Sequence, residues 1–247
     1  MGSPSRRKCE HSLMRKLLIT LVILGAVLVA ADYGLRWIAT TKISDAVASQ
    51  LRLAAAPEVK IAGFPFTWQA ISGRYDDVSI TVPNLSLGPV TGVDADLTLR
   101  DTTIGLSDAV AGNIDAMVAG AADLIVTLPV SSLAAALRLT GLAIATAPDG
   151  ALAISSTIAL AGQSIPVTGI LQAKIVDSVV QLRVGSLSAV GLAAPPQLLA
   201  AAGAGLGVDL PLTAVPFRID AASVSAVGGN VVITGAASNV RVADLRK

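Results

Sequence analysis

The residues of this chain best suited to chemistry are Asp94 and Asp96, which lie two positions apart in the alternating stretch 93–100. Alternation places both carboxylates on one side of a β-strand. A carboxylate pair can hold Ca²⁺ or cleave a glycosidic bond. Thr98 and Arg100 share that side, however, which is typical of a solvated polar face. We therefore favour the polar face and keep a glycan-acting enzyme as a third hypothesis.

Other residues that catalytic and metal sites need are scarce. The single Cys and the single His are Cys9 and His11, both close to the first residue. The remainder of the chain therefore offers no His- or Cys-based metal site and no Ser-His-Asp triad. No G-x-S-x-G motif occurs, and the glycines of 203–207 lack the spacing of a dinucleotide loop. We predict a protein that is not an enzyme and uses no cofactor or metal.

One short stretch, residues 60–77, is unusually rich in aromatic side chains. It holds four of the seven aromatic residues of the chain: Phe64, Phe66, Trp68 and Tyr75. Gly63 permits a turn, and Pro65 restricts the residue before it to extended geometry, so we expect a bulge or an edge-strand corner. Phe64 and Phe66 would then project on one side. The rings either plug the core or form the rim of an apolar cavity, and the two interpretations are compatible.

The elements that must position these residues are mostly strands. After Pro57 apolar and polar residues alternate, and Pro83-Asn84 is expected to end the first long strand. Turn residues such as Gly228-Gly229-Asn230 separate the strands, and their spacing predicts antiparallel neighbours in meander order. The predicted strands lie near residues 78–82, 93–99, 115–128, 142–147, 151–160, 165–176, 178–184, 215–226 and 230–242.

Three segments have helical patterns. Residues 41–55 form an amphipathic helix that we expect to face the core. Residues 128–141 and 194–205 begin with prolines and are apolar on nearly every side, so each must lie deep or face a nonpolar ligand. Their candidate buried residues are Leu133 and Leu137 in one helix and Leu198 and Leu199 in the other.

The composition indicates one β-rich domain with an unusual amount of apolar surface to bury. The chain has 247 residues, of which 53% are hydrophobic, 14% charged and only 3% aromatic. From Asp32 onward there are 13 Lys and Arg against 16 Asp and Glu, a net charge of −3. This part has no basic cluster, which excludes nucleic-acid binding.

The first residues carry an export signal. A basic region, residues 1–16, precedes an apolar run, and its first 13 residues are a possible extension ahead of a natural start at Met14. Residues 17–38 are either a signal peptide cut before Asp32 or an uncleaved membrane anchor. Both alternatives send residues 41–247, which we expect to form a single domain, across the cytoplasmic membrane to the cell envelope.

The segment G-F-P-F-T-W-Q, Gly63 to Gln69, resembles the G-F-P-F-L-T-Q-like motif of the actinobacterial LmeA-like family of exported phospholipid-binding proteins. The order of features is also similar: an export segment, a small amphipathic helix, the motif and a Val-Ser-Ile-Thr-Val strand. The later Leu128-Pro129 helix and Val215-Pro216-Phe217 strand fit as well. Trp68 departs from the motif, where a Thr or another polar residue is expected.

The resemblance implies a fold related to tubular lipid-binding proteins, an α+β architecture in which a long curved antiparallel sheet wraps apolar helices and leaves a hydrophobic groove. It implies phospholipid or a lipid-linked glycan as partner, and one branch of the family supports lipomannan maturation. No catalytic residues carry over. The groove residues that we assign are Phe64, Pro65, Phe66, Trp68, Leu133, Leu137, Leu198, Leu199 and Phe217. Candidate rim residues for a lipid headgroup are Lys60, Arg74 and Arg138.

The first hypothesis for function is therefore an exported protein of the cell envelope that binds phospholipid acyl chains, for lipid transfer or for lipoglycan maturation. The alternative is a structural or adhesive envelope protein with a filled core. Small aliphatic side chains favour the first, because they leave space that large rings would fill.

Overall fold

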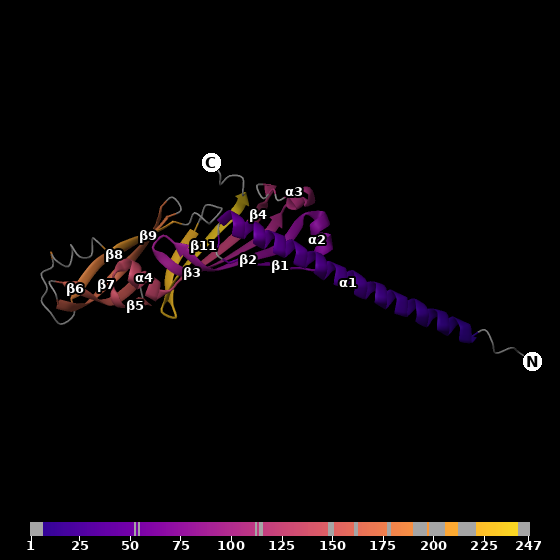
Figure 1. Ribbon diagram of the computed structural model, residues 1–247, viewed down its shortest axis with the longest axis horizontal. Coiled ribbons are helices and arrows are strands. Elements are labelled where there is room, and N and C mark those ends of the chain that lie inside the picture. Colours follow the sequence, from indigo (N-terminus) through magenta and orange to yellow (C-terminus); the bar gives the residue numbers. More distant parts are fainter. Residues whose placement is uncertain are drawn as a thin grey trace, which may run out of the picture.

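The computed structural model describes residues 7–51, 53, 55–111, 113, 116–147, 151–160, 163–176, 179–189, 197, 206–211 and 221–241. These residues form an elongated body of strands from which one long helix projects (Figure 1). The helices are α1 (Arg7–Leu51), α2 (Phe66–Ser72), α3 (Leu106–Ala111) and α4 (Val130–Leu137). The strands are β1 (Glu58–Ile61), β2 (Arg74–Leu87), β3 (Val90–Thr103), β4 (Val118–Leu128), β5 (Thr140–Thr146), β6 (Leu152–Leu160), β7 (Gln163–Val176), β8 (Val179–Ala189), β9 (Gly207–Pro211), β10 (Ala221–Val227) and β11 (Asn230–Arg241).

The described strands form two antiparallel sheets. One has six strands in the order β1-β2-β3-β4-β11-β10, and the other has five in the order β5-β6-β7-β8-β9. Among these strands, every pair except β4 with β11 is also adjacent in the chain, as consecutive strands usually are. The α+β class with antiparallel pairing is confirmed. The strands are divided between two sheets where the sequence suggested one.

The six-stranded sheet has one apolar and one polar face, because successive residues of a strand point to opposite sides. One row of directly paired residues across four strands is apolar: Val59, Ile80, Leu97 and Leu124. The next row is polar: Lys60, Ser79, Thr98 and Asp123. The predicted solvated face of β3 is therefore part of a polar surface that extends over several strands.

The five-stranded sheet follows the same rule, and the two sheets share one core. Its inner side carries buried aliphatic residues such as Leu152, Leu171 and Val184, which are paired across three strands. These belong to the same cluster of buried residues as the apolar face of the first sheet. The sheets also meet at their edges, where the Ala226 N–H of β10 donates to the Thr146 hydroxyl of β5 at 2.9 Å.

Helix α4 lies between the two sheets and contacts β3, β5 and β9. Pro129 precedes its first turn, and Arg138 ends it in the left-handed conformation with a φ of 56°. Leu133 and Leu137, one turn apart, are 0% and 2% exposed. The predicted helix is confirmed, although it is shorter than the segment 128–141 because Arg138 ends it early.

The predicted end of a strand at Pro83-Asn84 is wrong. Strand β2 continues to Leu87, with register shifts on both sides of Leu85. Asn84 has a φ of 56°, so the extra residue is accommodated as a bulge. Strand β1 pairs only with residues 78–81 of β2. Pro83 therefore lies where β2 is an edge strand, and there its missing N–H costs no hydrogen bond.

Other predicted elements vary in outcome. The strands expected near 115–128, 142–147, 151–160, 165–176, 178–184 and 230–242 are present within a few residues. The helix expected over 41–55 is the end of the much longer α1, and β9 was missed. The turns at 148–150 and 177–178, the residues 215–220 and, apart from Gln197, the helix 194–205 lie outside the described residues.

Candidate functional site

Helix α1 divides into a free half and a half that contacts the body. Large apolar side chains from Leu17 to Val29 are exposed, and Figure 1 shows this half extending away from the sheets. Among the described helices, α1 alone has the length and apolar composition of a membrane span. A signal sequence has the same properties, so α1 is compatible with a signal or an anchor.

The contact between the two parts is centred on Asp32, a buried carboxylate of α1. Its two oxygens accept hydrogen bonds from the backbone N–H groups of Phe66, at 2.9 Å, and Thr67, at 2.6 Å. One of them also accepts from the Thr67 hydroxyl at 2.7 Å. These N–H groups belong to the first turn of α2 and have no partner within that helix. Asp32 therefore caps α2 from a different helix.

Two further polar contacts extend the attachment along α1. The Arg36 guanidinium donates to the carbonyl oxygen of Gly63, and the Ser44 hydroxyl donates to that of Pro57 at 2.5 Å. Ala39 packs against the core between them. Because α1 is continuous from Arg7 to Leu51, the proposed domain start at residue 41 lies within this attached half.

The aromatic stretch folds differently from the expected extended corner. The backbone is extended at Pro65 and then turns into α2, which ends at Gly73 with a φ of 65°. The helix forms because Asp32 caps its beginning and a left-handed glycine ends it. Neither neighbouring residues nor periodicity reveals a cap that lies 34 residues away.

The four rings of this stretch differ in burial: Phe66 and Tyr75 are buried, whereas Phe64 and Trp68 are exposed. Phe66 is 5% exposed and lies beside Tyr75 of β2, with ring centroids 6.4 Å apart. Burial raises the pKa of the Tyr75 phenol. Gln69 is also buried, and its side-chain amide donates to the Ala62 carbonyl at 3.0 Å. This side of α2 fills part of the core.

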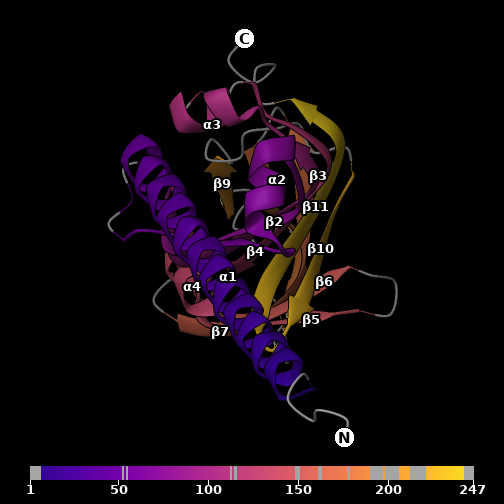
Figure 2. The ribbon, with the colours of Figure 1, turned by 90° about the vertical axis from the view of Figure 1, so that its right-hand side faces the viewer.

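The opposite side of α2 is apolar and exposed. Phe64, Trp68 and Ile71 are 62%, 70% and 67% exposed, which makes them the three most exposed large apolar side chains among the described residues outside α1. Pro65 is exposed beside them. We call Phe64, Trp68 and Ile71 the α2 patch. Figure 2 shows α2 next to α1 at the end of the body from which the free half projects.

The structure brings only some of the assigned groove residues together. Phe66, Leu133 and Leu137 belong to the common core, whereas Phe64, Pro65 and Trp68 face outward. Leu198, Leu199 and Phe217 lie outside the described residues. The assigned set therefore contains interior and exterior members, and sequence spacing alone did not separate them.

The candidate headgroup residues are distributed over three elements. Lys60 of β1 is exposed and forms an ion pair with Glu58 at 2.9 Å. Arg74 begins β2 and Arg138 follows α4, and both are exposed. Among the described residues, no ion pair involves Arg74 or Arg138. The three candidate cations therefore differ in their elements and in their charge partners.

The two aspartates on β3 make separate hydrogen bonds with β2. Asp96 accepts from the Thr81 hydroxyl at 2.7 Å, and Asp94 accepts from the Asn84 backbone N–H at 3.1 Å. On the same face Arg100 pairs with Asp123 at 2.5 Å. Within the part of the chain that the structure describes, no three His, Cys, Asp or Glu side chains gather as a metal site would require.

A shallow hollow of about 250 Å³ lies over β5, β6 and β7. Its lining includes the small residues Ala143, Ala145, Ala153 and Ser155. Ala143, Ala145 and Ser155 are exposed and alternate with buried residues, so the hollow is on the side of the sheet away from the core. Sequence reasoning missed it, because small residues on an outer face give no distinct pattern.

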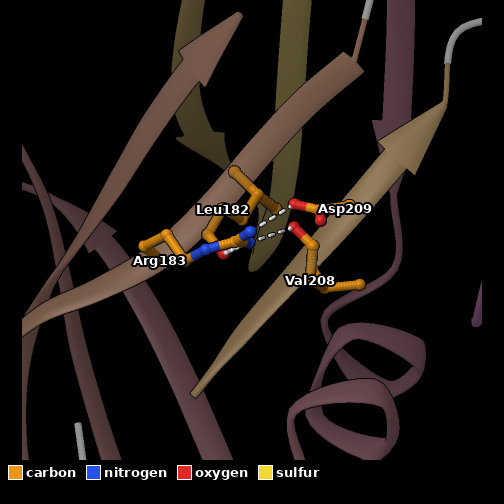
Figure 3. Close-up of polar contacts among 4 residues, drawn as sticks. All are labelled: Leu182, Arg183, Val208 and Asp209. Carbon is orange, nitrogen blue, oxygen red and sulfur yellow. Dashed lines mark hydrogen bonds and ion pairs between the residues drawn. The ribbon is translucent and has the colours of Figure 1, made fainter. Parts of the chain in front are cut away.

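The short strand β9 is attached to β8 by a surface ion pair, shown in Figure 3. Arg183 approaches Asp209 at 2.6 Å and also donates to the carbonyl oxygens of Leu182, at 3.1 Å, and Val208, at 3.2 Å. Its side chain crosses Gly207, where a Cβ atom would lie 2.5 Å from the Arg183 Cδ. A side chain at position 207 would therefore require the Arg183 side chain to move away from this point of β9.

Comparison with known proteins agrees with the geometry of an apolar, β-rich body. The model of the LmeA-like phospholipid-binding family matches residues 30–236, which includes the attached half of α1, all of α2 and α4, and most of both sheets. No curated protein and no solved structure matches the chain. Since the family model covers most of the sequence, this chain belongs to the LmeA-like phospholipid-binding family.

Proposed function

We propose that this protein is exported across the cytoplasmic membrane, remains attached to it through α1, and binds phospholipid acyl chains in the apolar interior of its body. The observation that carries the proposal is the match of the phospholipid-binding family to residues 30–236. The interior chemistry supports it, because the inner faces of both sheets are aliphatic.

The best candidate for the acyl-chain site is the seam beside α4, which is the place where α4 contacts β3 of one sheet and β5 and β9 of the other. Leu133 and Leu137 project from α4 between the two sheets, and α4 itself is short. Burial of each acyl CH₂ contributes about 0.8 kcal/mol. A strand of 14 residues, such as β2 or β3, extends over roughly 46 Å. That length exceeds the ~15 Å of one leaflet of hydrocarbon, so a whole acyl chain that lay along these strands would fit within their length.

The assigned residues divide into two roles within this proposal. Phe66, Leu133, Leu137 and, as predictions from the sequence, Leu198, Leu199 and Phe217 line the path of the acyl chain. Lys60, Arg74 and Arg138 are separate candidates for contact with the headgroup phosphate. The substrate is then a phospholipid or a lipid-linked glycan of the envelope, and lipoglycan maturation of the lipomannan type is one process that such binding would serve.

The basic residues just before the apolar run of α1 support the direction of export. Arg15 and Lys16 precede the apolar run, and basic residues favour the cytoplasmic side of a membrane. The body follows the helix and would lie on the other side. Attachment is favoured over release, because α1 continues without a break from the apolar run into the half that Asp32 and Arg36 hold against the body.

Native mass spectrometry of the full chain, purified in a mild detergent and mixed with phosphatidylinositol or phosphatidylglycerol, tests the binding. We expect adducts of one phospholipid mass. A lipid with a photoreactive group at the end of its acyl chain should then label buried residues of α4, β3, β5 and β9. It should spare the exposed side chains of Arg183 and Asp209. Absence of adducts, or labelling of the outer face alone, would contradict the proposal.

The alternative of a structural envelope protein rests on the density of the core. Leu128, Leu133, Leu182 and Leu210 are 0% exposed. A body of this kind that is filled by its own side chains would retain no lipid. It would show the same thermal unfolding with and without phospholipid, whereas a binding protein is stabilised by its ligand.

A further inference from the structure

The length of α1 fixes where a membrane surface would lie. Lys16 and Arg36 are 20 residues apart, and no charged residue other than Asp32 lies between them. At a rise of 1.5 Å per residue this interval is about 30 Å long, the thickness of the hydrocarbon core of a bilayer. The outer boundary of that core therefore falls close to residues 32–36.

The same residues hold α2. Asp32 accepts from the N–H groups of Phe66 and Thr67, and Arg36 donates to Gly63. These contacts place α2 at the level of the boundary. They also provide hydrogen-bond partners for the Asp32 carboxylate. Without such partners, a charged group at this depth would raise the free energy of the protein.

The exposed side of α2 is suited to that position. Trp68 and Ile71 are three positions apart in α2 and lie on one side of it, while Phe66 and Gln69 face the core. Phe64 is exposed just before the helix begins. The interval 61–73 contains no charged residue. An uncharged, apolar and exposed surface of this kind is unusual on a body that meets only water.

Two aromatic residues of α1 lie at the same level. Tyr33 and Trp37 are 60% and 70% exposed, and the Arg36 guanidinium lies 5.9 Å from the centre of the Tyr33 ring. Tyr and Trp are enriched where membrane proteins cross the bilayer surface. With Phe64 and Trp68, four of the seven aromatic residues of this chain are thus exposed around the point where α1 joins the body.

We propose that the α2 patch is a membrane-contact surface that inserts into the outer leaflet beside α1. The occupant is the lipid bilayer, because α2 lies next to α1 at the level where that helix would leave the membrane (Figures 1 and 2). The body then stands on the membrane with its α2 end, and both sheets extend away from the surface. This inference rests on the proposed anchoring by α1.

The chain carries its own probes for a test, because its two tryptophans are Trp37 and Trp68. Each single-tryptophan variant, Trp68→Phe or Trp37→Phe, is reconstituted as the full chain into phosphatidylcholine vesicles. Matched vesicles contain phosphatidylcholine brominated near the headgroup end of its acyl chains. Bromine quenches fluorescence on contact, so the fractional loss reports which indole ring enters the leaflet.

We expect both tryptophans to be quenched by more than half. Quenching of Trp37 without quenching of Trp68 would overturn the membrane-contact surface and leave the anchor intact, as expected if a partner protein covers the patch. Quenching of neither would overturn the anchor and with it this inference. Phospholipid binding by the body is measured separately by native mass spectrometry, so its outcome stays distinct.

A second measurement tests the patch itself. In the Trp37→Phe background, the double change Phe64→Ser and Ile71→Ser should reduce the quenching of Trp68 several-fold, because it removes the neighbours that hold the indole in the leaflet. Val227→Ser is the matched control, since Val227 is 58% exposed on β10. It should leave the quenching unchanged. Equal quenching in the double variant and the control would contradict the role of the patch.

Discussion

Asp32 of α1 binds Thr67 of α2 twice, through the backbone N–H at 2.6 Å and the side-chain hydroxyl at 2.7 Å, both to the same carboxylate oxygen. The other oxygen accepts from Phe66. Helix α2 has seven residues, and its own N-cap residue, Pro65, supplies no side-chain hydrogen bond. The stability of this short helix therefore depends on a residue of the apolar N-terminal helix.

Replacing Asp32 with Asn should weaken α2. The change removes the charge and one acceptor, so we expect a loss of about 1–3 kcal/mol in the free energy of unfolding. Hydrogen exchange of the full chain in detergent micelles should show faster exchange at Phe66 and Thr67. Asp45→Asn is the control, because Asp45 is an exposed residue of the same helix. Equal exchange in the two variants would argue against the capping role.

Gly73 should tolerate a side chain less well than Gly141. Both have positive φ, 65° and 64°, so a change to Ala costs about 1 kcal/mol of backbone strain at either position. At Gly73 the new Cβ would also lie 2.7 Å from the Ile104 carbonyl oxygen, whereas nothing lies within 4 Å at Gly141. We expect a clearly lower urea midpoint for Gly73→Ala than for Gly141→Ala. Similar midpoints for the two variants would show that the backbone near Ile104 moves to accommodate the new Cβ at little cost in stability.

Truncation of the buried Leu133 should lower the stability of the protein much more than truncation of the exposed Ile71. Leu133→Ala removes a fully buried side chain of α4, and such changes cost about 2–5 kcal/mol. Ile71→Ala removes a similar amount of apolar surface from a residue that is 67% exposed, so stability should change little. Thermal unfolding of both variants provides the comparison. If Leu133→Ala unfolds like the parent chain, the seam beside α4 is looser than its burial indicates.

The ion pair between Arg183 and Asp209 should add little to global stability. The two side chains are 44% and 54% exposed, and exposed pairs contribute about 0–1 kcal/mol. A double-mutant cycle with Arg183→Gln and Asp209→Asn measures this coupling. We expect the main effect to be faster hydrogen exchange in β9, because Arg183 also donates to Val208. A coupling energy well above this range would indicate a more specific role for the pair.

Several elements were predictable because their signals are local. The alternation at Val93, Ala95 and Leu97 gives the period of a strand, and β3 is present there. Leu133 and Leu137 have helical spacing after a proline, and α4 buries both. Asp94 and Asp96 share a side with Thr98 and Arg100, and that side is polar. In each case the pattern follows from which side of one element meets water.

Other features could not be predicted, because they depend on distant partners. β9 is short, and its pairing with β8 involves Arg183, more than 20 residues earlier in the chain. Pro83 is tolerated in β2 because β1 does not extend that far. The exposed side of α2 is set by its contacts with α1 and β2. No local pattern contains any of these relationships.

The sequence by itself determined a β-rich body with few reactive groups and an apolar, export-like first segment, because residue types and their periods directly encode preference for water, core or membrane. Only the tertiary structure decided that the aromatic stretch becomes a helix with Phe66 inside and Phe64 and Trp68 outside. The physical reason is that the cap of this helix is Asp32, which chain folding brings to Phe66 and Thr67 from another helix.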